Sequence, residues 1–161
     1  MKNLKITNVL AILVMVFGLL ITQNSCKDPC KDVECLNAGT CEEGICSCVT
    51  GYEGDDCGTE TRTKFFGTYA FSETCSPSGP DSYTVTVNTS STAVTDIKIS
   101  NIYNQGIIVN ASISGSTLTI PSQAFGSATI SGSGTISGNT LNLTYTVTGA
   151  TTDSCNGSGT K

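Results

Sequence analysis

Cysteine is the residue type with the widest chemistry in this chain. The 161 residues include nine cysteines and no histidine. A thiol can be oxidised to a disulfide, bind a metal as the thiolate, or be acylated. Six of the nine lie between Cys30 and Cys57, Cys26 precedes them, and Cys75 and Cys155 lie far downstream. The absence of histidine excludes His-based catalytic triads and His-ligated zinc.

The six clustered cysteines follow the spacing C-x4-C-x5-C-x4-C-x-C-x8-C. A segment this short cannot bury enough apolar surface to offset the entropy of the chain. Disulfides that restrict the unfolded chain replace a core, at roughly 2–4 kcal/mol each. A cysteine-rich zinc site is the competing interpretation, but the spacing lacks paired CxxC motifs. Spacing alone leaves many disulfide pairings open.

This spacing, together with the stretch Gly51-Tyr52-Glu53-Gly54, resembles an EGF-like domain over residues 30–57. Calcium-binding members carry an Asn or Asp between the third and fourth cysteines, where this chain has Glu42-Glu43-Gly44-Ile45. We therefore expect no metal here and interpret the acidic residues as a solvated surface. The resemblance implies three disulfides: Cys30–Cys41, Cys35–Cys46 and Cys48–Cys57.

The N-terminus has the pattern of a signal peptide. Lys2 and Lys5 precede an apolar run of 13 residues, Val9 to Ile21. A membrane-spanning helix needs about 20 apolar residues, so a cleaved signal over residues 1–25 is the better interpretation. The mature protein is then expected in an oxidising compartment, where disulfides persist.

The signal ends in Gln23-Asn24-Ser25-Cys26, which resembles a bacterial lipobox. The resemblance implies cleavage before Cys26 and acylation of that residue. The number of cysteines favours acylation of Cys26. Eight of the nine can form disulfides, and Cys26 is the one left over. Ordinary cleavage near Ser25, leaving a free or disulfide-bonded Cys26, is the alternative. We expect a cell-envelope protein that is lipid-anchored to the outer membrane or cell surface.

The composition changes near residue 60. Residues 26–60 contain nine acids and two lysines, net −7, whereas residues 61–161 contain four acids and four bases and are rich in Ser, Thr and Gly. We expect a lipid-anchor cysteine and EGF-like module over 26–57, a linker over 58–64 and a second domain over 65–161. The acidic balance excludes a nucleic-acid-binding protein, because phosphate contacts need clustered Lys and Arg.

The second domain alternates apolar and polar residues with the period of two that is typical of half-buried strands. The segment 113–120 is repeated at 136–143, and each copy predicts a hairpin with a Ser-Gly turn. The pattern predicts a mainly β protein in which the module precedes an eight-stranded antiparallel meander. The predicted strands are 66–74, 82–88, 93–100, 107–114, 117–121, 127–136, 140–148 and 154–160.

Cys75 and Cys155 are expected to form the fourth disulfide, since they remain once the other cysteines are assigned. They end the first strand and begin the last, and a disulfide needs Cα atoms within about 7 Å. Pairing would place these strands side by side and close the meander into a barrel. An open sandwich is the alternative if the thiols are free.

The domain also resembles the small lipocalin-like β domains of secreted bacterial proteins. The resemblance rests on the stretch Phe66-Gly67-Thr68-Tyr69, on the Ser-Gly-Asn-Thr-Leu hairpin at 137–141, and on the two downstream cysteines. It implies an interior that is either filled or open to one small ligand. The glycines at 132 and 134 would leave space, unless a large side chain such as Tyr145 or Phe66 fills it.

The titratable residues of the second domain show no spacing suited to acid–base catalysis, and we interpret them as solvated surface charges. They are Glu73, Asp81, Asp96, Lys98, Asp153 and Lys161. We expect no enzyme and no cofactor. The predicted function is that of a surface-displayed lipoprotein with an EGF-like spacer or interaction module and a barrel interaction domain for an unidentified protein or glycan. The alternative is binding or transport of a small apolar ligand in the barrel.

Overall fold

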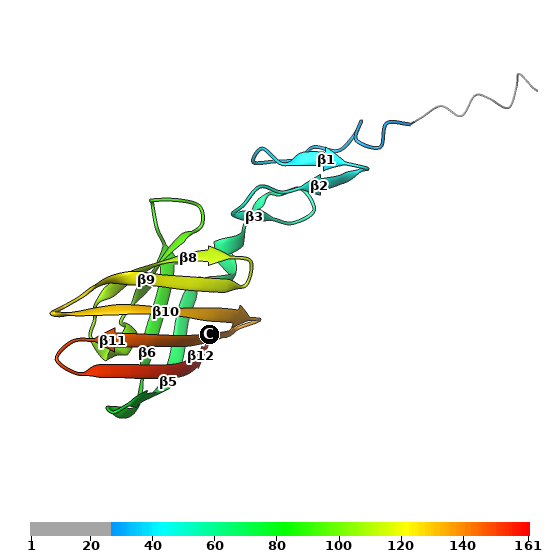
Figure 1. Ribbon diagram of the computed structural model, residues 1–161. Coiled ribbons are helices and arrows are strands. Elements are labelled where there is room, and N and C mark those ends of the chain that lie inside the picture. Colours follow the sequence, from blue (N-terminus) through cyan, green and yellow to red (C-terminus); the bar gives the residue numbers. More distant parts are fainter. Residues whose placement is uncertain (1–26) are drawn as a thin grey trace, which may run out of the picture.

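The computed structural model describes residues 27–161, and these form a small disulfide-rich module followed by a closed β-barrel (Figure 1). The predicted signal peptide and the predicted lipidation site, Cys26, lie outside the described residues. Among residues 27–161 there is no helix with the length and apolarity that a membrane crossing requires.

The module is built from two small hairpins and three disulfides. Strand β1 (Thr40–Glu42) pairs with β2 (Ile45–Ser47), and β3 (Tyr52–Glu53) pairs with β4 (Thr59–Glu60). The turn between β1 and β2 is tight because Gly44 adopts a φ of 89°. The disulfides join the pairs that the sequence resemblance implied: Cys30–Cys41, Cys35–Cys46 and Cys48–Cys57.

The junction between the module and the barrel is ordered by hydrogen bonds. Residues 58–64, assigned to a linker from composition, contain β4 and most of a 3₁₀ helix, η1 (Thr61–Phe65). The Arg62 guanidinium donates through Nη1 to the carbonyls of Ser90, Ala93 and Asp96, at 2.8–3.0 Å. The next apolar residue, Phe65, is fully buried in the barrel core. The junction is therefore attached to the barrel rather than freely jointed.

Eight antiparallel strands form the barrel, as predicted. Their spatial order is β10-β11-β12-β5-β6-β7-β8-β9, and the ring is closed. The strands are β5 (Gly67–Ser76), β6 (Gly79–Thr89), β7 (Asp96–Ser100), β8 (Ile108–Ser114), β9 (Thr117–Phe125), β10 (Ala128–Ser137), β11 (Thr140–Thr148) and β12 (Thr152–Thr160).

Most predicted strand limits differ from the observed ones by up to four residues, and two of the larger differences have identifiable reasons. Strand β9 was expected to end at residue 121, but it continues to Phe125. Pro121, which cannot donate a hydrogen bond, lies at the irregularity in the pairing between Ile130 and Gly132 of β10. Strand β7 was expected to begin at residue 93, but it begins at Asp96. The preceding residues instead form the loop whose carbonyls bind Arg62.

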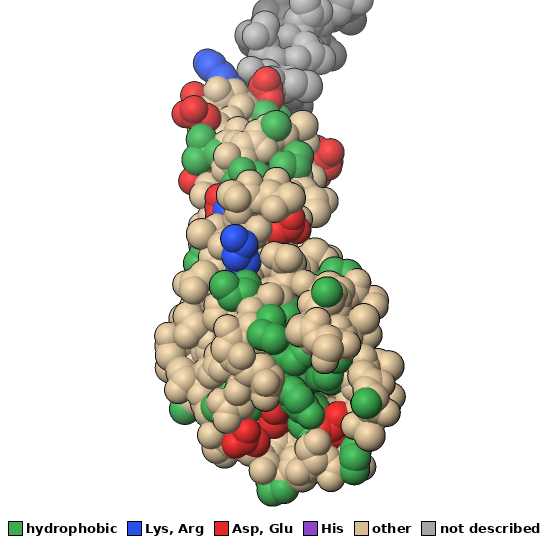
Figure 2. Space-filling view, turned by 90° about the vertical axis from the view of Figure 1, so that its left-hand side faces the viewer, with side chains coloured by type: hydrophobic (Ala, Val, Ile, Leu, Met, Phe, Trp, Pro, Cys, Tyr) green, Lys and Arg blue, Asp and Glu red, His purple; other side chains and the backbone are tan. Residues whose placement is uncertain are grey.

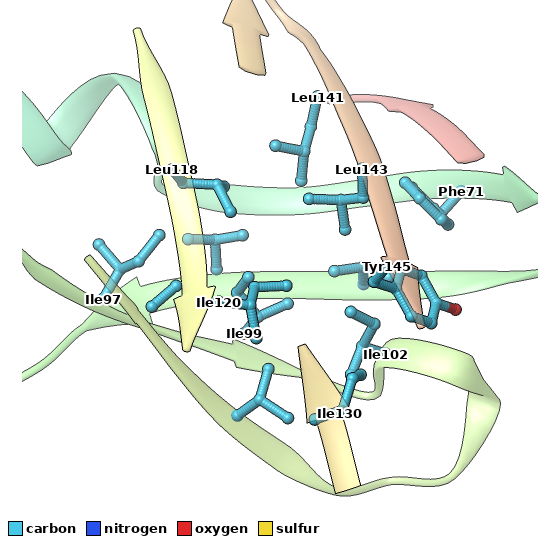
Figure 3. Packing of buried hydrophobic residues seen from close by; sticks show 14 of the residues in the cluster. Phe71, Ile97, Ile99, Ile102, Leu118, Ile120, Ile130, Leu141, Leu143 and Tyr145 are labelled. Atoms are coloured by element: carbon cyan, nitrogen blue, oxygen red, sulfur yellow. The ribbon is translucent and has the colours of Figure 1, made fainter. Parts of the chain in front are cut away.

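The barrel interior is filled by side chains from all eight strands. Figure 3 shows part of this packing, around Ile99, Leu143 and Tyr145. The two glycines expected to leave space are covered. A Cβ at Gly132 would lie 2.5 Å from Cβ of Tyr145, and one at Gly134 would lie 2.6 Å from Cδ2 of Leu143 and 3.2 Å from Leu118. Tyr145, one of the two side chains named as alternatives to a cavity, thus occupies this region.

Because neighbouring strands are antiparallel, successive connections alternate between the two ends of the barrel. The turns at 90–95, 115–116 and 138–139 lie at the end next to the module. The turns at 77–78, 101–107, 126–127 and 149–151 lie at the opposite end, which we call the mouth. The longest mouth connection contains a second 3₁₀ turn, η2 (Ile102–Asn104).

The barrel closes where β12 pairs with β5. Cys75 and Cys155 face each other in this register, with Cα atoms 4.0 Å apart, and form the fourth disulfide. The predicted pairing and the closed sheet are both observed. Closure also removes two exposed strand edges that would otherwise be open to pairing with other chains.

Replacing this disulfide with alanines should destabilise the barrel without opening it. The bond links positions 80 residues apart. In the chain-entropy model, the variant Cys75→Ala/Cys155→Ala should therefore lose roughly 4 kcal/mol of unfolding free energy. Denaturant titration followed by circular dichroism measures this loss. The matched control is Ser76→Ala/Ser154→Ala, the adjacent, outward-facing pair on the same two strands. A variant as stable as this control would contradict the expectation.

Candidate functional site

The mouth of the barrel gathers acidic side chains, and the opposite end carries the basic ones. Glu73, Asp81 and Asp153 lie at or near the mouth turns, whereas Arg62 and Lys161 lie at the module end. On the face shown in Figure 2, acidic side chains lie toward the far end of the barrel and a basic side chain lies at the junction, where acidic side chains of the module also lie. The mouth therefore has a negative electrostatic character, although the domain as a whole is neutral.

Glu73 is the acidic residue placed most unusually. It lies on the inward face of β5 and is 5% exposed. The Tyr145 hydroxyl donates a hydrogen bond to its Oε2 atom. Burial raises the pKa of the Glu73 carboxyl, and the nearby charges of Asp81 and Asp153 act in the same direction, against the hydrogen bonds from the tyrosines.

Tyrosine hydroxyls connect Glu73 to the mouth loop. The hydroxyls of Tyr145 and Tyr83 lie 3.4 Å apart, and the Tyr83 oxygen accepts a 2.8 Å hydrogen bond from the backbone N–H of Tyr103. Burial raises the pKa values of Tyr83 and Tyr145 well above the usual tyrosine range. Both hydroxyls therefore remain protonated and act as hydrogen-bonding groups, not as bases.

The mouth loop 101–107 folds over this network. Ile102 is fully buried in the core, and the Tyr103 ring packs edge-on against Tyr145. The loop reverses direction through three non-glycine residues with positive φ: Asn101 at 64°, Tyr103 at 58° and Asn104 at 52°. Such residues carry a conformational cost that the surrounding contacts must offset. The buried Ile102 side chain and the bond to Tyr83 supply those contacts.

Asp153 fastens the loop from the other side of the mouth. Its Oδ2 accepts a 2.7 Å hydrogen bond from the Tyr103 hydroxyl, and its Oδ1 accepts one from the N–H of Ser78. Although Asp153 is only 3% exposed and desolvation opposes ionisation, the hydrogen bonds from Ser78 and Tyr103 lower the pKa of its carboxyl. An ionised Asp153 is therefore fully engaged in holding two mouth turns together.

One group of potential metal ligands occurs in the part of the chain that the structure describes. A carboxylate oxygen of Glu73 and the sulfurs of Cys75 and Cys155 lie within 4.8 Å of one another. The two sulfurs are joined in a disulfide, so they supply no thiolates. This arrangement does not fit a metal centre in the oxidised protein.

A pocket of about 270 Å³ opens beside Glu73, between the β5–β6 turn and the mouth loop. Its walls include Glu73 and Asp81 on one side and Tyr103, Asn104 and Gln105 on the other. It contains oxygen acceptors and amides but no Lys or Arg.

The sequence interpretation of these acids as solvated surface charges was wrong for Glu73 and Asp153. The missed signal was their register. Glu73 follows Tyr69 and Phe71 at intervals of two, which places it on the inward face, and Asp153 bears the same relation to Cys155. The structure brings both residues to the mouth with Asp81. Lys98 lies on β7 and Asp96 begins that strand at the module end, so neither reaches the site.

No family model matches the chain.

The raised pKa of Glu73 should make stability depend on pH. The folded chain holds this proton to a higher pH than the unfolded chain does, so the stabilisation is present below the usual glutamate pKa and is lost as the pH rises through the raised value. In Glu73→Gln this loss should disappear, and the unfolding free energy should vary less with pH than in the wild type. Denaturant titrations across the acidic and neutral range measure the difference.

Two further variants control this experiment. Asp96→Asn, at the module end, should retain the pH dependence of the wild type. Glu73→Ala leaves the Tyr145 hydroxyl with only the 3.4 Å contact to Tyr83 and should cost about 1–3 kcal/mol at every pH. A Glu73→Gln curve parallel to that of the wild type would contradict the assignment.

Proposed function

We propose that this protein is a membrane-anchored, surface-displayed lipoprotein without enzymatic activity, in which the barrel presents its outer surface to a partner. The observation that carries the proposal is the filled interior. Tyr145, Leu143 and Leu118 occupy the space next to the two inward glycines. At the mouth, Glu73 and Asp153 accept hydrogen bonds from tyrosine hydroxyls. A barrel filled by its own side chains is suited to interaction through its surface.

We infer that residues 30–57 are an EGF-like module acting as a spacer or interaction element. The cysteine spacing and the three disulfides support this identity. The attachment through Arg62 would hold the barrel at a defined position relative to the module. The exposed Ile45 on β2 offers an apolar contact on an otherwise acidic module.

The barrel itself is proposed to be lipocalin-like. Eight antiparallel strands in simple meander order support this identity. The inferred partner is a protein or a glycan, because the domain has no basic surface for nucleic acid. Binding of a small apolar ligand in the interior is the other candidate, and the packing around Gly132 and Gly134 argues against it.

The anchor is inferred from the sequence Ser25-Cys26 at the end of the apolar N-terminal run. Acylation of Cys26 would use the cysteine that the four disulfides leave unpaired. It would place the protein in the cell envelope, at the outer membrane or cell surface. Firm attachment needs more than one acyl chain, as lipidation of both the thiol and the new amine would provide.

Loss of the thiol tests the anchor. Wild-type protein should partition into the detergent phase, and Cys26→Ser should either remain unprocessed or appear in the aqueous phase. Phase partitioning and intact mass measure both outcomes. Cys75→Ser/Cys155→Ser is the control, because it removes two disulfide-bonded cysteines without touching the anchor. A soluble wild-type protein with unmodified Cys26 would refute the proposal.

An apolar fluorescent probe separates the interaction function from the ligand function. Because the interior is filled, the probe should show no saturable binding to the folded protein. Fluorescence titration measures this directly. Leu118→Ala and Leu143→Ala, which remove side chains covering Gly134, should create space and increase probe binding. Saturable, stoichiometric binding to the wild type would favour the ligand function instead.

A further inference from the structure

The backbone pairing of the barrel wall is interrupted between β8 and β9, which lie side by side (Figure 1). Their ladder is confined to the module end, from Ser112 opposite Thr119 to Ser114 opposite Thr117. In the same register Asn110 would lie opposite Pro121, which has no N–H to donate. Residues 108–111 of β8 therefore lie beyond the ladder, and we call the space between them and residues 120–125 of β9 the seam.

The backbone of β8 presents an edge to the seam. Neighbouring residues of a strand direct their N–H and C=O groups to opposite sides of that strand. The N–H of Ile113 donates to the carbonyl of Thr95, on the β7 side. The backbone groups of Ile108 and Asn110 alternate with it and therefore point toward β9.

One side chain takes the place of the missing strand at Asn110. Gln123 Oε1 accepts a 2.9 Å hydrogen bond from the Asn110 N–H, and Gln123 Nε2 donates to the Asn110 carbonyl at 2.7 Å. Nε2 also donates to the Pro121 carbonyl at 3.2 Å. A carboxamide offers the same donor and acceptor as a peptide group, so Gln123 makes the pair of bonds that a neighbouring strand would make. The edge of β8 thus already holds a peptide-like group.

The next outward residue along this edge, Ile108, is exposed. Its side chain is 56% exposed, and within the barrel, residues 65–161, it is the one large apolar side chain in that state. In a paired sheet, the side chain directly opposite on the neighbouring strand would pack against such a residue. The ladder with β9 ends before Ile108, so this cross-strand partner is missing.

These groups together fit an extended peptide. An added strand supplies alternating N–H and C=O groups to a sheet edge and alternate side chains to the surface beside it. A small apolar ligand could cover Ile108 but could not match the backbone groups. Residues 99–152 contain no Asp, Glu, Lys or Arg, so the seam offers no charge for an ionic partner.

We propose that the seam is a latent strand-pairing site, at which an extended, uncharged segment of a partner protein replaces the Gln123 carboxamide on the edge of β8. Gln123 closes the seam in the free barrel, and Ile108 is the apolar contact beside it. Release of the two bonds to Asn110 is the step that opens the edge. The inference rests on the display function proposed above and names the surface and the type of partner.

Amide hydrogen exchange followed by NMR tests the opening. In Gln123→Ala the Asn110 N–H loses its acceptor, and its exchange should accelerate at least about tenfold relative to the amides of β11 and β12. Gln105→Ala, which changes an exposed glutamine of the mouth loop, is the matched control and should exchange like the wild type. Equal acceleration in all strands would show that Gln123 only stabilises the whole barrel, and would overturn the proposal.

The binding experiment titrates the purified protein with a synthetic peptide of alternating threonine and valine that has a lysine at each end for solubility. Saturable shifts are expected at the Ile108 and Asn110 amides, and the Gln123 side-chain signals should move toward those of an exposed glutamine. Gln123→Ala should bind about tenfold more tightly, because no bond within the barrel must be broken first.

Ile108→Ser should bind the same peptide about tenfold more weakly, because the apolar contact is lost. Since Ile108 is exposed, this variant should fold, and it keeps the test decisive if Gln123→Ala does not. Affinity unchanged in Ile108→Ser would show that the peptide binds elsewhere.

The control ligand is the same peptide with N-methylated backbone nitrogens, which cannot donate hydrogen bonds to a strand edge. Equal binding of this ligand would overturn the proposal, as would the absence of saturable shifts in both the wild type and Gln123→Ala. Concentration-dependent shifts at Ile108 without peptide would show that a second copy of the chain is the occupant instead. None of these outcomes involves Cys26, so failure here and failure of the anchor are told apart.

Discussion

The pairing of β12 with β5 is the constraint on which the rest of the barrel depends. It joins the last strand to the first, so every strand has two neighbours and no edge remains open. The Cys75–Cys155 disulfide lies in this pairing and links chain positions 80 residues apart. Closure gives every strand an inward face, and the alternating residues of all eight strands then meet in one core.

The same pairing creates the polar centre of the mouth. Glu73 lies two residues before Cys75 on β5, and Asp153 lies two residues before Cys155 on β12. Closing the barrel therefore carries two carboxyl groups to one end and places Tyr145, from the next strand, against Glu73. The cost of burying these groups is offset by hydrogen bonds that also fasten the strained loop 101–107.

The two ends of the barrel consequently differ in role. At the module end, Arg62 binds loop carbonyls, and Lys161 donates to the carbonyls of Lys64 and Phe66, so the charges are used to hold the chain together. At the mouth, Asp153 has the same structural use, and Glu73 accepts a hydrogen bond from the Tyr145 hydroxyl beside the pocket.

Local chemistry in the sequence was sufficient to predict the fold class and most strand limits to within about two residues, because period-two alternation depends on near neighbours along the chain. The cysteine spacing alone left the pairing open. The three disulfides of the module were implied by a resemblance, and the fourth by the two cysteines that remained. The Arg62 junction, the course of β9 through Pro121 and the filling of the space at Gly132 were decided only by the tertiary structure. Each depends on a contact between residues distant in the sequence. For the same reason, Glu73 and Asp153 could be assigned to the inward face from their register, but their meeting at one mouth required the closed barrel.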